Sequence, residues 1–177
     1  MISRRGIDTI LEKHFLDSIV FLPEIELIRR GVACNTPTIF DIGSGGGFPA
    51  IPLAIMKSEW GFTLCESVKK KANFLTSLAN ELKLKNVKIE NNRVEALHAR
   101  TLHKNKYDFV TVRAIGKLDE LIKLALPLLK KDGYLLAYKA KDIDKELNAI
   151  NKLNLQTKIY TKEINGVVRN LVATGTL

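Results

Sequence analysis

Asp41-Ile42-Gly43-Ser44-Gly45-Gly46-Gly47-Phe48-Pro49 is the stretch that decides the fold. It follows a short apolar run at 38–42 that indicates a buried strand, and it precedes a helical pattern at 49–57. Glycines at such a junction let the backbone approach a ligand closely and adopt positive φ. Because open α/β sheets bind ligands at the carboxyl ends of their strands, this loop predicts a ligand site.

The spacing of the glycines discriminates between kinds of ligand. The dinucleotide fingerprint GxGxxG needs Gly or Ala at its last position, which is Phe48 here, and the Walker lysine pattern is absent. An acid two residues before the first glycine, followed by Gly-x-Gly-x-Gly, is typical of loops that bind S-adenosylmethionine. We therefore expect Asp41, Gly43, Gly45 and Gly47 to lie at a site for that cofactor.

Outward from the loop, strand and helix patterns alternate along the chain. Further strands are expected at 61–66, 86–90, 107–114 and 134–139, and helices at 67–84, 117–131 and 142–153. Two last strands, 157–164 and 167–174, flank Asn165-Gly166, a strong hairpin signal. The pattern predicts a doubly wound, Rossmann-like α/β fold with a mostly parallel sheet and a C-terminal antiparallel hairpin.

A segment rich in helical patterns precedes this core. Residues 8–20 carry an apolar stripe with Asp8 as a plausible N-cap, and a second helical piece at 23–30 ends at Gly31. The length of 177 residues predicts one domain, in which 1–36 form an N-terminal helical segment and 37–177 the cofactor-binding core.

Composition narrows the class of partner. The net charge is +9 with a pI near 9.6, which favours a polyanionic partner such as nucleic acid. No apolar run approaches the ~20 residues that span a bilayer, so no membrane partner is expected. The cysteines, Cys34 and Cys65, lack metal-ligand spacing and are expected to be free, packed thiols of a cytoplasmic protein that binds no metal.

Glu66 ends the second predicted strand, 21 residues after Gly45. An acid at this place can accept hydrogen bonds from both ribose hydroxyls of a bound nucleoside, as in dinucleotide sites. The alternative is an ordinary charge at a strand end. We expect Glu66 to contact the ribose of the cofactor.

Five stretches make the sequence specific to one family. They are His14-Phe15-Leu16-Asp17-Ser18, the loop from Asp41 to Ala54, Glu66 to Leu75, Asn92-Arg93-Val94-Glu95 and Val112-Arg113-Ala114, in this order. Together they closely resemble the small-subunit ribosomal RNA guanine-N7 methyltransferases, the GidB (RsmG) family. The resemblance runs from about Gly6 to Leu177. It implies methylation of guanine N7 at a specific site in 16S ribosomal RNA, with 16S RNA or the small ribosomal subunit as partner.

The resemblance also implies roles for individual residues. Gly43 and Phe48 would line the S-adenosylmethionine site, Val94 and Glu95 would contact the adenine, and Arg113 would lie beside the methyl-donor pocket. Glu66 replaces a more usual aspartate, and Ala140 stands after Lys139 where the family commonly has glycine. Members usually carry a further N-terminal helix and an Asn-Leu-Thr segment that this sequence lacks, so part of the RNA-binding face is expected to be missing.

Methylation at guanine N7 needs no general base, because the nitrogen attacks through a lone pair and no proton leaves. We therefore expect Arg113 to act by positioning. The sequence has no [DN]-P-P-[FYW] after the fourth core strand and no Pro-Cys nucleophile, motifs of exocyclic-amine and pyrimidine-carbon methylation.

RNA contacts are expected from His14, Lys69, Lys70, Lys71 and Lys139, in a protein that acts as a monomer. His14 and Asp17, at i and i+3, are equally well interpreted as a surface pair. Two other functions stay open at this stage. They are a small-molecule methyltransferase on the same fold and a non-catalytic RNA-binding assembly factor.

Overall fold

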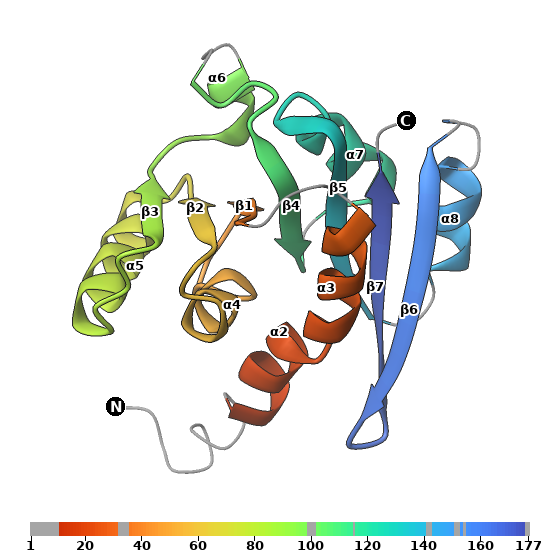
Figure 1. The fold of residues 1–177 in the computed structure, drawn as a ribbon, viewed down its shortest axis with the longest axis horizontal. Helices are drawn as coiled ribbons and strands as arrows, with labels where there is room; N and C mark the ends of the chain where they lie inside the picture. The colour runs from red at the N-terminus through yellow and green to blue at the C-terminus, as the bar shows by residue number, and fades with distance from the viewer. Residues whose placement is uncertain are drawn as a thin grey trace.

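The computed structural model describes residues 11–31, 36–98, 102–114, 116–140, 143–150, 153 and 155–175. Its strands form one sheet in the order β3-β2-β1-β4-β5-β7-β6 (Figure 1). The strands are β1 (Thr38–Ile42), β2 (Gly61–Cys65), β3 (Val87–Glu90), β4 (Tyr107–Arg113), β5 (Leu129–Lys139), β6 (Gln156–Ile164) and β7 (Val167–Gly175). The helices are η1 (Leu11–Leu16, a π-helix), α2 (Asp17–Ile19), α3 (Leu22–Gly31), α4 (Ala50–Met56), α5 (Lys69–Glu81), α6 (Val94–His98), α7 (Leu118–Ala125) and α8 (Asp144–Ile150).

The sheet confirms the predicted fold class. Strands β1 to β5 pair in parallel, whereas β7 runs antiparallel to both β5 and β6. The hairpin turn has positive φ at both Asn165 and Gly166, the conformation that a type I′ turn requires. The crossovers place the carboxyl ends of β1, β2 and β4 at one edge, so the loops that follow these strands adjoin one another.

Helices cover both faces of the sheet (Figure 1). On one face, α6, α7 and α8 bury a core that includes Leu97, Leu121 and Ile150. On the other face, α3, α4 and α5 bury a second core that includes Ile25, Leu53 and Leu75. Strand β4 is buried between these two layers along nearly its whole length, as expected for a parallel strand inside the sheet.

Several predicted boundaries were wrong. The helix expected at 117–131 ends at Ala125, because Pro127 disfavours helix before it and Leu129 pairs with Tyr107 in the sheet. The N-terminal helix is divided into η1 and α2, and the short helix α6 was not predicted. Asp8 and Cys34, both named from the sequence, lie outside the described residues.

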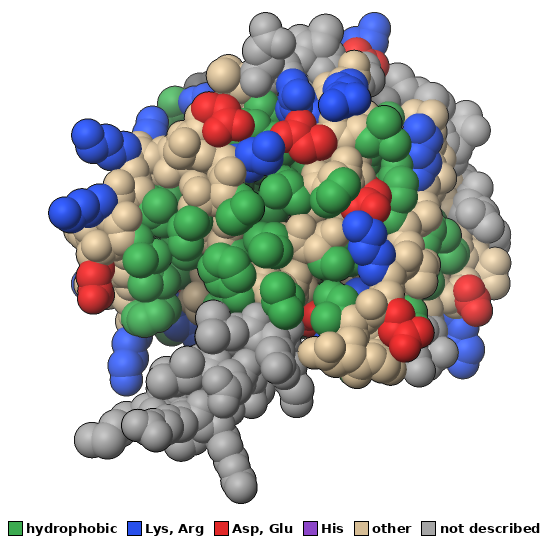
Figure 2. All heavy atoms as spheres, turned by 60° about the horizontal axis from the view of Figure 1, so that its bottom comes forward, with side chains coloured by type: hydrophobic (Ala, Val, Ile, Leu, Met, Phe, Trp, Pro, Cys, Tyr) green, Lys and Arg blue, Asp and Glu red, His purple; other side chains and the backbone are tan. Residues whose placement is uncertain are grey.

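The face toward the bottom of Figure 1 presents apolar side chains between lysines, arginines and acids (Figure 2). The exposed apolar side chains of α3, α4 and α5 include Leu27, Ile55, Met56 and Phe74. In that view the two signs of charge alternate around the apolar area. Among the described residues, no helix has the length and apolar character that crossing a membrane demands.

Candidate functional site

The glycine loop joins the end of β1 to the start of α4. Gly43, Gly45 and Gly47 have φ of 66°, 52° and 92°. A Cβ on Gly47 would lie 2.6 Å from Cγ1 of Ile51, so the packing of the loop on α4 requires glycine there. A Cβ on Gly45 would meet only the carbonyl oxygen of Gly43, at 3.7 Å. The side of the loop at Gly45 is therefore open to a ligand.

Glu66 follows β2 and holds this loop from below. Its Oε2 accepts a hydrogen bond from the backbone N–H of Gly45 at 2.9 Å, and its Oε1 accepts one from the N–H of Val68 at 2.8 Å. The residue is 5% exposed. The carboxylate thus fixes the loop against the start of α5, a role that the sequence did not indicate.

Asp41 lies directly beneath the loop and is 1% exposed. Its Oδ1 accepts a hydrogen bond from Oγ1 of Thr111 at 2.7 Å. Its Oδ2 is buried with no hydrogen-bond partner among the residues that the structure describes. Burial raises the pKa of Asp41 to about 6, although hydrogen bonds from Thr111 and Ser44 oppose that shift. An acceptor left over beneath a glycine loop fits a cationic amino group or a water molecule.

A cleft of about 290 Å³ opens on one side of the loop. The predicted residues Gly43, Val94 and Glu95 all line it, because α6 places the last two opposite the end of β1. The remaining lining residues are Ile42, Cys65, Ser67, Asn92, Arg93 and Leu124. The cleft thus brings Gly43 together with the two residues predicted for the adenine, whereas Glu66, predicted for the ribose, is not among its lining residues.

The surroundings of Cys65 support its interpretation as a packing residue. Its Sγ donates to the carbonyl oxygen of Asn92 at 3.2 Å, and it is 2% exposed. Burial, with help from nearby carboxylates, raises the pKa of the thiol to about 12. The thiolate needed for nucleophilic attack is therefore disfavoured.

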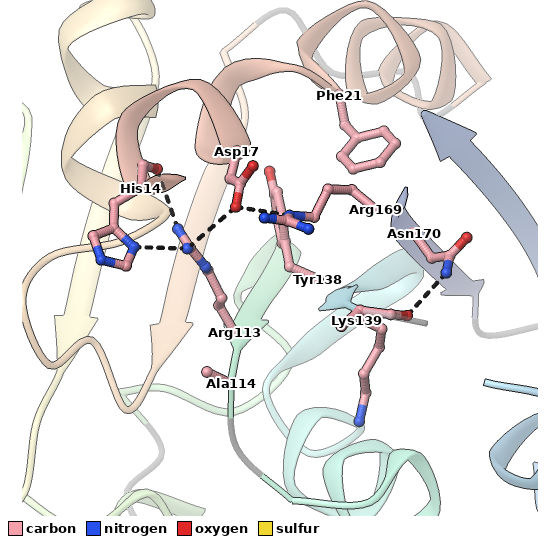
Figure 3. A pocket seen from close by; sticks show the side chains of 10 residues that line it. His14, Asp17, Phe21, Arg113, Ala114, Tyr138, Lys139, Arg169 and Asn170 are labelled. Carbon is pink, nitrogen blue, oxygen red and sulfur yellow. Dashed lines mark hydrogen bonds and ion pairs between the residues drawn. The ribbon is translucent and has the colours of Figure 1, made fainter. Parts of the chain in front are cut away.

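A second pocket, of about 340 Å³, lies between the N-terminal helices and the ends of β4, β5 and β7 (Figure 3). Arg113, at the end of β4, donates to the carbonyl oxygen of His14 at 3.1 Å and lies 2.9 Å from Nδ1 of the same residue. The ring of Phe48 lies 5.2 Å from the His14 ring and 5.9 Å from the guanidinium of Arg113. Phe48 belongs to the glycine loop, so the loop packs against two residues that line the pocket.

The lysines predicted for RNA contact fall into two groups. Lys69, Lys70 and Lys71 begin α5 and are exposed, next to Ser67 of the first cleft. Lys139 lines the second pocket, but its Nζ donates to Glu146 at 2.7 Å and to the carbonyl oxygen of Gly116 at 2.9 Å. Its ammonium group points away from the arginines of the pocket (Figure 3).

Sequence reasoning missed much of the second pocket. Asp17 appeared only as a partner of His14, and Phe21, Tyr138, Arg169 and Asn170 were not named. An arginine in a strand of the C-terminal hairpin gives no local signal of a site. Within the described part of the chain, no cluster of three or more His, Cys, Asp or Glu side chains suited to a metal ion occurs.

Comparison with known proteins gives one family. The profile of the GidB family, described as rRNA small subunit methyltransferase G, matches residues 1–172. Ribosomal RNA small subunit methyltransferase G of Polynucleobacter asymbioticus is 41% identical over 138 residues, which cover 78% of this chain and 60% of that protein. The enzyme of the same name from Streptococcus agalactiae is 40% identical, over 79% of this chain and 57% of that protein. The matched region thus spans less than two thirds of these relatives.

Solved structures share the fold at low sequence identity. A SAM-dependent methyltransferase from Aquifex aeolicus matches with a TM-score of 0.64 at 16% identity, covering 94% of this chain and 92% of that one. TYW2 of M. jannaschii, solved in complex with AdoMet, matches with a TM-score of 0.62 at 19% identity, covering 85% and 74%. These matches establish the Rossmann-like methyltransferase fold of the chain.

Proposed function

The chain belongs to the GidB family of rRNA small subunit methyltransferases, and from this membership we propose that it methylates N7 of a guanine in 16S ribosomal RNA with S-adenosylmethionine as donor. The observation that carries the proposal is the glycine loop: it has an open side at Gly45, Gly43 lines the first cleft, and Phe48 packs against His14 and Arg113 of the second pocket. One cleft suits the donor and the other suits the base.

The residues around the loop fit S-adenosylmethionine. The unpartnered Oδ2 of Asp41 is an acceptor for its ammonium group, directly or through water. Val94 and Glu95 would hold the adenine in the first cleft, and Glu66 would receive the ribose hydroxyls while it continues to hold Gly45. When bound, the cofactor supplies an electrophilic methyl carbon on a sulfonium centre.

The chain's residues need only to orient the reactants. The N7 lone pair forms the new bond to carbon while the electron pair of the broken carbon–sulfur bond stays on sulfur, and no proton moves. Arg113 acts by position, since its contacts to His14 fix one wall of the second pocket. Alignment of the two reactants is then the main source of rate acceleration.

The charge of +9 supports an RNA substrate. The exposed Lys69, Lys70 and Lys71 would contact phosphates beside the first cleft, and His14 and Lys139 would border the second. Binding of small ribosomal subunits should therefore weaken steeply as salt rises, through release of counterions. We further propose that the protein acts as a monomer in the cytoplasm.

The experiment that tests the function is methyl transfer to small ribosomal subunits from a strain that lacks this gene. With labelled S-adenosylmethionine, we expect 7-methylguanine at a single position, located by mass spectrometry of the digested 16S RNA. The single-turnover rate should be nearly level from neutral pH upward, because no base must be deprotonated. Label on an exocyclic amine or a pyrimidine carbon would overturn the guanine-N7 proposal, and methylation of small molecules alone would favour a different substrate class.

A further inference from the structure

Asp17 connects two arginines that come from distant parts of the chain. Nε of Arg169 donates to Oδ2 of Asp17 at 2.8 Å, across 152 residues of sequence, and Nη2 of Arg113 lies 3.6 Å from the same oxygen. The Asp17 side chain is only 7% exposed. Both guanidinium groups converge on this carboxylate at one side of the second pocket (Figure 3). Asp17 therefore sets where the two cations lie.

The guanidinium group of Arg169 has an N–H donor that remains available to a ligand in the pocket. Its Nε is used by Asp17, and its Nη1 donates to the carbonyl oxygen of Val168 at 3.3 Å. For Nη2 the described residues provide no hydrogen-bond partner, and the side chain, 22% exposed, lines the pocket. An arginine has donors and no acceptor, so this edge of the pocket accepts only a ligand group that has lone pairs.

The rest of the pocket offers aromatic and small side chains to the faces of a flat ligand. Phe21 and Tyr138 meet edge to face, with ring centroids 6.0 Å apart, and Ala114 adds a small side chain at the end of β4. The side chain of Asn170 is already engaged, since it donates to the carbonyl oxygen of Ala140 and accepts from Thr161. A volume of about 340 Å³ lies in the range of small-ligand pockets.

Guanine and adenine differ on the edge that holds N7. Guanine presents the O6 acceptor beside N7, whereas adenine presents an amino donor there. Building on the proposed function, we infer that Nη2 of Arg169 donates to O6 of the target guanine in this pocket, and that Asp17 positions Arg169 for this contact. Adenine would place its amino group against an N–H donor, so Arg169 is the residue that determines base specificity.

The test compares bases that differ at this atom. Small ribosomal subunits are assembled with the target guanine, once located, or with 2-aminopurine, which keeps N7 and lacks O6. We expect the wild-type protein to methylate guanine about 10- to 100-fold faster in single turnovers. Arg169→Ala should slow guanine by a similar factor and leave the 2-aminopurine rate nearly unchanged, so that the preference collapses. The dissociation constant of S-adenosylmethionine should stay the same.

Further variants separate the contact from charge and from folding. Arg169→Lys keeps the charge but cannot reach Asp17 and O6 together, so the preference should fall as well. Asp17→Asn should lower the preference, and Asp17→Glu should restore part of it. Arg29→Ala is the matched control, because Arg29 is 24% exposed and pairs with Glu26 outside the pocket. Arg29→Ala should keep the wild-type preference for guanine over 2-aminopurine.

Each other outcome has a distinct meaning. Equal slowing of both bases in Arg169→Ala would overturn the inference and assign Arg169 a structural role. A larger dissociation constant for S-adenosylmethionine in Arg169→Ala would overturn the inference too, because Arg169 would then bind the carboxylate of the cofactor. If the wild-type protein makes no 7-methylguanine at all, the proposed function fails before base specificity is measured.

Discussion

Thr111 donates a hydrogen bond to Asp41 across the β1–β4 pair, at the two positions that face each other in the parallel register. The bond satisfies Oδ1 of a carboxyl group that is almost fully enclosed, and Oδ2 stays without a partner in the described part of the chain. The hydrogen bond from one hydroxyl does not compensate for the hydration that the carboxylate loses on burial. The pKa of Asp41 is therefore raised to about 6. Two predictions rest on this group.

The first concerns stability. The pKa of Asp41 in the folded protein, about 6, lies above its ordinary value of 3.8. Protonation of Asp41 therefore stabilises the folded state. This stabilisation is complete below pH 4 and is lost as the pH rises through 6. Asp41→Asn should therefore be more stable than wild type at pH 7, by on the order of 3 kcal/mol, and similar to it near pH 4. Urea unfolding at several pH values measures this. A difference that is constant with pH would show that folding leaves the pKa of Asp41 unchanged.

The second concerns the cofactor. An ammonium group binds best to ionised Asp41, so the affinity for S-adenosylmethionine should rise from pH 5 to pH 7 and then level off. Asp41→Asn should bind more weakly at pH 7 and show a flat profile. Calorimetric titration with adenosine, which lacks the ammonium group, is the control. The same rise with adenosine would remove Asp41 from recognition of the amino acid end.

Two glycines of the loop should respond differently to alanine. Gly45→Ala meets no close atom, so it should cost only the ~1–2 kcal/mol of a left-handed residue, while its methyl group enters the ligand space. We expect S-adenosylmethionine affinity to fall at least about tenfold. Gly47→Ala pushes against Ile51 and should lose about 1–3 kcal/mol more of stability. Thermal unfolding and calorimetry on both variants separate the effects; normal binding by Gly45→Ala would exclude this loop as the site.

Glu66 should affect both the loop and the ligand. Glu66→Ala leaves the N–H groups of Gly45 and Val68 without their acceptor, which should cost about 1–3 kcal/mol of stability and weaken cofactor binding as well. Glu66→Gln keeps one acceptor oxygen, so its stability and its affinity for the cofactor should lie between those of the wild type and of Glu66→Ala. Denaturation and titration of the same samples provide the measurement. Full stability in Glu66→Ala would mean that water replaces the carboxylate under the loop.

The sequence predicts the sheet and the loops at its edge better than it predicts the second pocket. Buried parallel strands such as β1 and β4 are short, mostly apolar runs, and the loops after them must meet at one edge of the sheet. This logic found Gly43 and Glu66, whereas Val94 and Glu95 came only from the family resemblance. It did not find α6, because five residues carry too little periodicity.

The pairing of Asp17 with Arg169 has no sequence signal of this kind. It depends on how η1 and α2 dock against the C-terminal hairpin, which is set by long-range packing. The same reason explains why His14 and Asp17 had two equal interpretations from the sequence. In the structure both face Arg113.

Contacts between the first and last parts of the chain also determine when the second pocket exists. Tyr138 reaches Ser18 across 120 residues, and Lys162 reaches Val20 across 142. Closing such long loops is entropically expensive and comes late in folding. A nascent chain that ends after β5 holds the complete glycine loop but lacks Arg169. The proposed contact of Arg169 with the base therefore requires the synthesis and docking of β7, whereas the glycine loop is complete before β5 has been made.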